Sequence, residues 1–237
     1  MRANADARDR IAAIAHRRAA VLLYAAIQFV ALTAIAIRVY AGGYDFFANF
    51  LSELGATYTW SGQPNHAAAA LFSIALGTLG AAFVAFASAW RAFAFAHGRA
   101  RAVGIAGQLF GTTSGIAFVA VAVTPVNLAL DLHNAFVIAA FSLLLGYAAS
   151  MTIVWSRNGA TKAQLAACVA YVLLVCAYAA AVVVAVRSGV GTEHGRRILV
   201  VSQKIIAYAS MLYIMYLTIA IRRTANRSQQ PRARRSE

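Results

Sequence analysis

The chain has 237 residues, of which 62% are hydrophobic and only 12% are charged, and its mean hydropathy is +0.68. Soluble domains are usually about a quarter charged and about half apolar, so this composition indicates an integral membrane protein. The formal net charge of +14 would suggest a nucleic-acid partner in a soluble protein. Here the arginines lie in tails and short loops beside apolar segments, which favours anionic lipid headgroups as partners and argues against nucleic acid.

Six segments are long and apolar enough to cross the hydrocarbon core as helices, which takes about 20 residues each. They cover residues 19–41, 66–90, 102–124, 134–155, 163–187 and 198–221. Basic tails flank them at 1–18 and 222–237, and we expect the second tail to be disordered. The first segment is longer than the apolar region of a signal peptide, so we interpret it as a retained span. The predicted fold is an all-α bundle of six transmembrane helices, in which short connections make neighbours antiparallel.

The distribution of positive charge predicts the orientation of these spans. Sixteen of the 21 lysines and arginines lie in the two tails, in the second connection or in the fourth. By the positive-inside rule these regions face the cytoplasm, so we expect a multi-pass protein of a bacterial-type inner membrane with both termini cytoplasmic. Four of the seven acids, Asp45, Glu53, Asp131 and Glu193, then lie on the outer side. We therefore expect any ligand site or chemistry at the outer end of the bundle.

The first outer loop contains the stretch YDFFANFLSELG, in which Asp45 is a good helix N-cap and Gly55 a good helix stop. Between them five apolar residues recur at helical spacing and share one face, namely Phe46, Phe47, Phe50, Leu51 and Leu54. Ser52 and Glu53 fall on the other face. The pattern predicts a short amphipathic helix in the outer interface. Its polar face either meets water, with the helix as an anchor, or turns inward and caps a cavity in the bundle.

The third predicted span carries a stripe of glycines at Gly107, Gly111 and Gly115, repeating every four residues. Small residues let helix backbones approach closely, so the stripe predicts dense packing of this span within the bundle. A homo-oligomer interface through the same three glycines is the alternative.

Asp131 and His133 lie at the mouth of the fourth span, where their spacing can place both side chains near one metal ion or one proton-transfer site. Alternatively, Asp131 caps the span and His133 reaches outward to the interface. His66 begins the second span and is either a cap-region residue or a further ligand. Glu193 and His194 belong to a charged third loop, which is either solvated or, with its paired arginines, binds an anion.

Lys204 lies about six residues into the last predicted span. A charged side chain at the bilayer centre costs about 2.5 to 3.5 kcal/mol on insertion scales, and it usually has a partner. We expect Lys204 to pair with Glu53 or Asp131, and Gln203 beside it to add a hydrogen bond. The alternative is that the lysine stem extends outward to the interface.

The stretches YDFFANFLSELGA, NHAAAALFSIALGTLG and GIAFVAVAVTPVNLALDLHNAF, followed by SQKI, resemble the bacterial six-helix membrane proteins catalogued as domain of unknown function 998. The similarity covers about residues 20 to 221. In that family a Leu-Ser-x-Leu-Gly segment follows the first span, and an aspartate or histidine pair opens the fourth. The resemblance implies the same fold and topology, a role for Ser52, Leu54, Gly55, Asp131 and His133, and no particular substrate. The family is also distantly similar to eukaryotic membrane proteins of the Frag and DRAM type.

Three functions fit these observations. The first is a non-enzymatic bundle that binds a lipid or small ligand, senses or scaffolds, through an outward-facing site formed by Glu53, His66, Asp131, His133, Glu193, His194 and Lys204. The second is an outward-facing, metal-dependent intramembrane hydrolase or lipid-modifying enzyme, with catalytic residues Ser52, Asp131 and His133 and zinc ligands from His66, Asp131, His133 and His194. The third is a proton-coupled transporter in which Lys204 and an acid form the coupled pair. No cofactor motif occurs in the sequence, and zinc belongs only to the second reading.

Overall fold

The computed structural model describes residues 2–95, 101–157, 160–189 and 191–233. These residues form six α-helices and a short 3-10 helix, η1, which spans Leu51–Gly55. The α-helices are α1 Arg2–Val39, α2 His66–Phe95, α3 Arg101–Ala122, α4 Leu130–Arg157, α5 Lys162–Arg187 and α6 Glu193–Ala233. Each contains a segment long and apolar enough to cross a membrane, so the predicted six-helix membrane fold is confirmed.

The two terminal helices run farther than the apolar spans that the sequence predicts. Helix α1 begins at Arg2, and α6 continues to Ala233, so the tail expected to be disordered from 222 onward starts as helix. Alanine, arginine and glutamine are good helix formers, which favours propagation of a helix beyond its apolar part. The remainder of that predicted tail, 234–237, lies outside the described residues.

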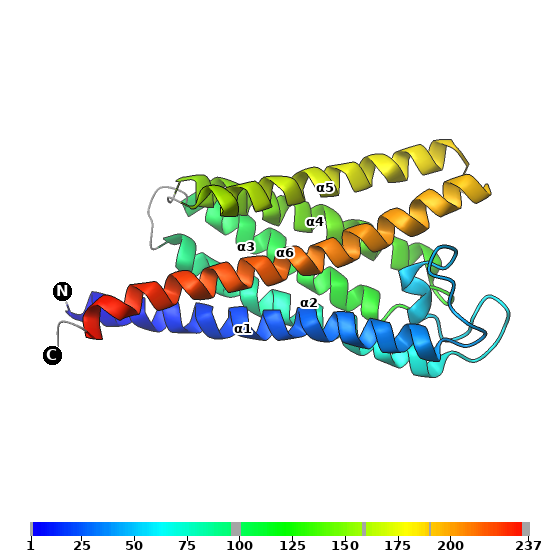
Figure 1. Ribbon diagram of the computed structural model, residues 1–237, viewed down its shortest axis with the longest axis horizontal. Coiled ribbons are helices and arrows are strands. Elements are labelled where there is room, and N and C mark those ends of the chain that lie inside the picture. Colours follow the sequence, from blue (N-terminus) through cyan, green and yellow to red (C-terminus); the bar gives the residue numbers. More distant parts are fainter. Residues whose placement is uncertain (1, 96–100, 158–159, 190, 234–237) are drawn as a thin grey trace.

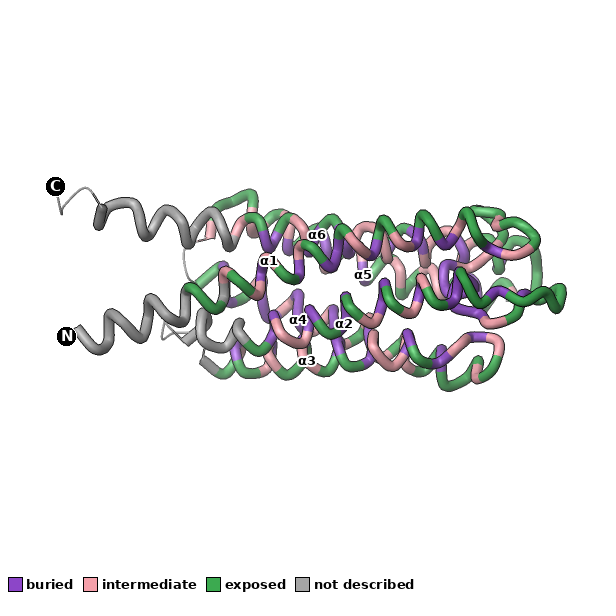
Figure 2. The backbone as a smooth tube through the Cα atoms, turned by 90° about the horizontal axis from the view of Figure 1, so that it is seen from below, coloured by how far each residue is buried: buried purple, intermediate pink, exposed green. Residues whose placement is uncertain are grey.

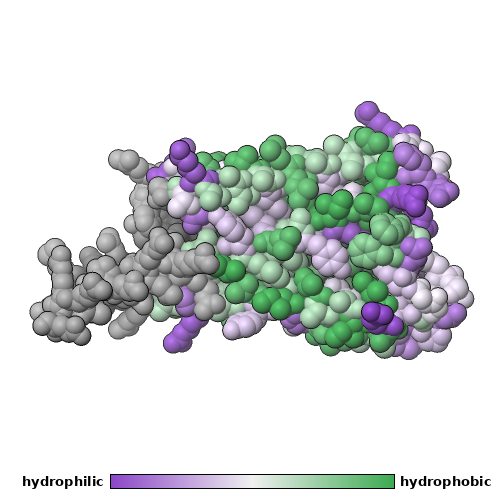
Figure 3. Space-filling model, in the orientation of Figure 1, coloured by the Kyte–Doolittle hydropathy of each residue, from purple (hydrophilic) through white to green (hydrophobic). Residues whose placement is uncertain are grey.

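Helices that follow one another in the chain pack side by side, and α6 closes the ring against α1. Figure 1 shows the start of α1 and the end of α6 at one end of the bundle, with η1 and its loops at the other, which we call the η1 end. On the face shown in Figure 3, most of the strongly hydrophilic side chains gather at the two ends. The apolar surface between them is what a helix bundle exposed to lipid requires.

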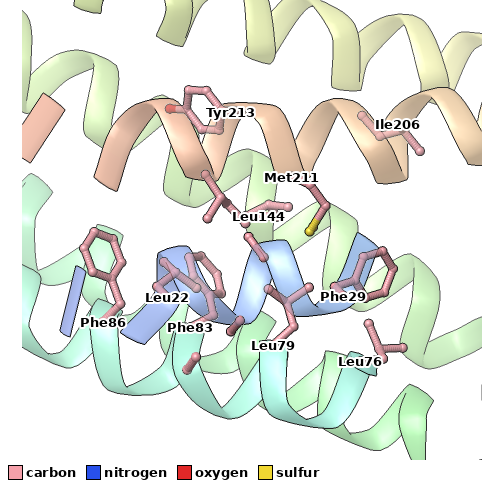
Figure 4. Packing of buried hydrophobic residues seen from close by; sticks show 14 of the residues in the cluster. Leu22, Phe29, Leu76, Leu79, Phe83, Phe86, Leu144, Ile206, Met211 and Tyr213 are labelled. Carbon is pink, nitrogen blue, oxygen red and sulfur yellow. The ribbon is translucent and has the colours of Figure 1, made fainter. Parts of the chain in front are cut away.

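A continuous cluster of buried hydrophobic side chains occupies the interior of the ring and surrounds a cavity described below. Figure 2 shows the buried stretches of the helices turned toward the interior of the bundle. In Figure 4, Phe29 of α1 and Leu79 of α2 lie close together, and Met211 of α6 points toward them. Closer to the end that carries the termini, the rings of Phe83 and Tyr147 meet edge to face at 5.1 Å, joining α2 to α4.

The glycine stripe of α3 packs within the chain. A Cβ at Gly115 would lie 2.8 Å from the carbonyl oxygen of Gly80, and a Cβ at Gly80 would lie 2.7 Å from that of Gly115. Gly111 is equally close to Tyr147 of α4, at 2.8 Å, and Gly107 is also buried. Close packing of α3 against α2 and α4 thus uses the stripe as predicted. An oligomer through the same glycines stays a prediction.

Candidate functional site

Residues 45–55, between α1 and α2, form a turn followed by η1, and we call them the cap segment. Its first half is a turn in which the Asp45 carboxylate accepts hydrogen bonds from the backbone N–H groups of Phe47, at 2.8 Å, and Ala48, at 3.1 Å. Asp45 is therefore a capping residue, as predicted, but it caps one turn and not an amphipathic helix. The second half of the segment is η1, which is shorter than the helix expected between Asp45 and Gly55.

All five residues of η1 are buried, whereas Phe46 and Phe47 are 43% and 60% exposed. The alternative in which the polar face meets water is therefore not formed by η1, where Ser52 and Glu53 are as enclosed as their apolar neighbours. The reason is that η1 contacts α1, α2 and α6 and has protein on every side. Of the two orientations left open by the sequence, the inward one is formed.

Glu53 is only 1% exposed, and its carboxylate holds the cap segment together. It accepts hydrogen bonds from the Asn49 side chain at 2.6 Å and from the Phe50 backbone N–H at 3.1 Å. Arg196 of α6 forms an ion pair with it at 3.4 Å and also donates to the Ala48 carbonyl. A buried carboxylate is tolerated only when hydrogen bonds and an opposite charge compensate its lost hydration, and Glu53 has both.

Lys204 holds the same segment from α6 and is 3% exposed. Its Nζ donates a hydrogen bond to the backbone carbonyl of Asn49. The ammonium also lies 5.5 Å from the ring centroid of Tyr44 and 5.0 Å from that of Phe46, within the range of cation–π attraction. The cost of burying this lysine is thus offset by a carbonyl and two aromatic rings.

The direct ion pair predicted between Lys204 and Glu53 or Asp131 is not formed. Asp131 is exposed, and the ion pair of Glu53 is with an arginine. Asn49 joins the two charges instead, because its carbonyl accepts from Lys204 while its side-chain amide donates to Glu53. The sequence offers no signal for this arrangement, since the backbone carbonyl that replaces the acid carries no residue-specific signature.

Two further side chains complete the attachment of the cap segment. Gln203 accepts a hydrogen bond from the Leu51 backbone N–H at 2.9 Å. This amide was predicted to add a hydrogen bond to an ion pair of Lys204, and it binds the backbone of η1 instead. The Tyr44 hydroxyl donates to the Asn49 carbonyl at 3.2 Å. Burial raises the pKa of Tyr44, and the neighbouring Tyr208 and Glu53 raise it further, which keeps this hydroxyl protonated as a donor.

Two asparagines that the sequence analysis did not single out connect the loops at the η1 end. Asn65 is 2% exposed; its amide donates to the Ala56 carbonyl at 2.9 Å and accepts from the Ala41 N–H at 3.2 Å. Asn127 accepts from the Thr57 N–H at 3.0 Å. In the sequence, these asparagines could be recognised only as residues typical of turns. That pattern does not show which distant loop each side-chain amide contacts.

A cavity of about 550 Å³, counted with the open space at its mouth, lies between η1 and the middle of the bundle. The lining is mostly apolar and comes from η1 and from every helix except α5. It consists of Phe29, Leu51, Ser52, Phe72, Leu76, Leu79, Phe118, Val121, Val137, Phe141, Gln203, Ala207, Ser210 and Met211. Figure 4 shows Phe29, Leu76, Leu79 and Met211 of this set.

Three of the lining residues have polar side chains, namely Ser52, Gln203 and Ser210, and all three are uncharged. Ser210 is satisfied, because it donates to the Ile206 carbonyl at 2.6 Å and lies 2.8 Å from the Tyr171 hydroxyl. Within the described residues, the Ser52 hydroxyl forms no hydrogen bond, and the amide of Gln203 bonds only through its oxygen. Neither the hydroxyl nor the NH₂ group is fully enclosed, unlike the buried unpartnered atoms of Thr112, His133 and Tyr147. The Leu51 N–H orients the Gln203 amide, because it binds the oxygen and leaves the two N–H donors free.

Asp131 and His133 do not form the paired site that their spacing suggested. Asp131 is exposed in the first turn of α4 and is not its cap, since the helix already begins at Leu130. His133 is 2% exposed and does not reach outward; its Nδ1 lies 2.7 Å from the Thr124 carbonyl. The ring is held at the end of α3 by this hydrogen bond, which points it away from solvent. Its Nε2 has no partner in the described part of the chain.

The other predicted ligands lie separately at the η1 end. His66 is exposed and packs edge to face on Tyr58 at 5.4 Å between ring centroids. Glu193 and His194 are exposed at the start of α6. Within residues 2–95, 101–157, 160–189 and 191–233, no group of three or more His, Cys, Asp or Glu side chains is arranged to hold a metal ion.

A scan against family models finds no match for the chain, and searches of curated proteins and of solved structures find none either. The resemblance to the family of unknown function therefore stays a prediction. The positions that it highlighted divide into two groups in the structure. Ser52, Leu54 and Gly55 form η1 over the cavity, whereas Asp131 and His133 lie apart from the cavity lining.

Proposed function

We propose that the protein is a membrane-embedded bundle that binds a lipid or another small apolar molecule in the cavity beside η1. The observation that carries this proposal is the lining, which is apolar over most of its surface and includes two polar residues at η1, Ser52 and Gln203, whose hydroxyl and NH₂ group have no protein partner among the described residues. A site of this composition binds an apolar body and orients it by a few polar contacts.

The attachment of the cap segment supports the same proposal and suggests how binding is sensed. Ser52 belongs to η1, and Gln203 holds η1 through the Leu51 backbone while also lining the cavity. A ligand that contacts Ser52 and Gln203 therefore acts directly on the joint between η1 and α6. Occupancy of the cavity would then change how firmly the cap segment is held.

The orientation in the membrane is part of the proposal. We place the η1 end outside and both termini in the cytoplasm of a bacterial-type inner membrane, because the tails and two of the connections carry most of the lysines and arginines. Anionic headgroups then contact the opposite, basic end. The ligand reaches the cavity from the outer leaflet or from the outer surface.

Photo-crosslinking with octadecane that carries a diazirine in the middle of its chain tests the proposal, using the full chain in lipid nanodiscs. We expect crosslinks on cavity-lining peptides of α2 and α6, around Leu79 and Met211. Ala207→Phe fills the cavity and should abolish these crosslinks. Ala34→Phe, at an exposed position of α1, adds the same side chain outside the cavity and should leave them unchanged.

The proposal fails if the probe labels only lipid-facing side chains in the wild-type protein. It also fails if Ala207→Phe and Ala34→Phe retain the same labelling of Leu79 and Met211, because the labelled space would then not be this cavity. Circular dichroism and elution volume of the two variants separate a filled cavity from an unfolded protein.

A further inference from the structure

We propose that the ligand is a single-chain amphiphile whose head is uncharged and contains a hydrogen-bonding oxygen, as in a long-chain alcohol, ester or amide. The head lies against Ser52 and Gln203, and the chain extends toward Met211. This inference rests on the proposed function, because it names the class of ligand for the same cavity.

The charged side chains near η1 do not form part of the cavity lining. Glu53 is occupied by Asn49, Phe50 and Arg196, and the Lys204 ammonium is occupied by the Asn49 carbonyl and two rings. An ionic headgroup in the cavity would lose hydration without gaining an opposite charge, which is strongly unfavourable in an apolar environment. The lining therefore selects against both anionic and cationic heads.

The two unpartnered groups define what the head must offer. The Gln203 NH₂ group is a donor and requires an acceptor, whereas the Ser52 hydroxyl both donates and accepts. A single ligand oxygen can accept from both, and a hydroxyl oxygen can also donate to Ser52. A pure hydrocarbon would leave both protein groups unsatisfied, which costs free energy in a buried site.

The position of these groups gives the ligand a direction. Gln203 and Met211 lie eight residues apart on α6, which corresponds to about 12 Å along the helix axis. Beyond Gln203, toward Met211, the lining includes the apolar side chains of Phe29, Leu76 and Leu79. The polar side chain in this part of the lining is Ser210, and its hydroxyl already has hydrogen-bond partners. A ligand with its head at η1 and a single chain running toward the bundle centre matches this arrangement. Its polar head then meets Ser52 and Gln203, and its chain meets the apolar lining.

Competition against the octadecane diazirine probe tests this inference in nanodiscs of fixed lipid composition. The competitors are octadecanol, octadecanoate and octadecyltrimethylammonium, compared at equal mole fraction in the bilayer. The variants are Ser52→Ala, which removes a hydroxyl without a protein partner, and Gln203→Glu, which keeps an acceptor for the Leu51 N–H but removes the NH₂ donor. Ser202→Ala is the control, because Ser202 neighbours Gln203 but does not line the cavity.

We expect octadecanol to compete best with the wild-type protein. Ser52→Ala should weaken its competition by roughly two- to tenfold, the effect of one lost hydrogen bond. Gln203→Glu should weaken octadecanol in the same way and strengthen the trimethylammonium competitor, whereas Ser202→Ala should change neither.

Equal competition by the three amphiphiles, or octadecanol competition unchanged by both Ser52→Ala and Gln203→Glu, overturns the inference about the head and leaves the cavity proposal intact. Absence of cavity labelling by octadecane itself overturns the proposed function. The two failures are thus distinguished by the unsubstituted probe.

Discussion

At the scale of single residues, the cap segment depends on one enclosed carboxylate. The Glu53 carboxylate accepts hydrogen bonds from the Asn49 side-chain amide and the Phe50 backbone N–H, both in the cap segment, and pairs with the Arg196 guanidinium of α6. If the carboxylate were removed, the Asn49 amide and the Phe50 N–H would lose their acceptor, whereas Arg196, which is 49% exposed, would keep the Ala48 carbonyl. A buried donor left without an acceptor costs about 1 to 3 kcal/mol, more than a typical intact hydrogen bond contributes.

Glu53→Gln tests this dependence with little change in side-chain volume. We expect a decrease of about 1 to 3 kcal/mol in the free energy of unfolding, because the amide removes the charge that pairs with Arg196 and directs N–H groups at existing donors. The midpoint of unfolding in detergent measures the effect. The control is Glu193→Gln, at an exposed position near the start of α6, which should shift the midpoint very little. Equal shifts in the two variants would contradict the role given to Glu53.

Residue chemistry alone predicted part of this site. Lys204 was identified because a charge within an apolar span is costly, and Glu53 and Ser52 because they interrupt an apolar loop. Their partners were not predictable. Lys204 binds a backbone carbonyl, and the partner of Glu53 is Arg196, whose loop was expected either to be solvated or to bind an anion. Proximity in the chain misled the interpretation of Asp131 and His133, which lie two residues apart but differ completely in burial.

At the scale of elements, the sequence predicted a helix in the first loop but left two alternatives for its environment. Helical spacing of apolar residues identified a helix in the first loop, but the same spacing fits an interfacial anchor and an enclosed cap. Gly55 shows the difference clearly. It was expected to stop a helix, and it does end η1, yet its φ angle is negative. A Cβ at Gly55 would lie 2.6 Å from Phe72, so the glycine is required for close approach to α2.

Gly55→Ala should therefore separate η1 from α2 or force the Phe72 ring to move. We expect a loss of about 1 to 3 kcal/mol in unfolding free energy, the usual cost of overpacking, and weaker labelling of the cavity, because Phe72 also lines it. Gly191→Ala is a matched control, since nothing lies within 4 Å of a Cβ there. Combining Gly55→Ala with Phe72→Leu should cost less than the two separate losses added together. Strict additivity would show that the clash with Phe72 is not the cause.

At the scale of the whole molecule, the six spans were predictable because length and hydropathy suffice for that purpose. The closure of the ring and the cavity within it were not. Lipid-facing and core-facing side chains are both apolar in a membrane, so hydrophobicity does not tell one face of a span from the other. The adjacent residues Met211 and Leu212 illustrate this, being 5% and 69% exposed. Only the glycine stripe of α3 carried information about packing, because small size, unlike hydrophobicity, marks a close helix contact.

The contact between α2 and α3 gives the sharpest test of the bundle as a whole. Gly115→Ala would bring a methyl group within 2.8 Å of the Gly80 carbonyl oxygen, and a backbone atom cannot rotate away as a side chain can. Overpacking costs about 1 to 3 kcal/mol, which exceeds the gain of about 1 kcal/mol that alanine brings to a helix interior. Gly77→Ala, one turn from Gly80 on α2, meets only Ala122 at 3.7 Å and should be neutral or stabilising. Thermal unfolding in detergent should therefore rank Gly77→Ala at or above the wild type and Gly115→Ala below it, and the reverse order would contradict the α2–α3 contact on which the ring depends.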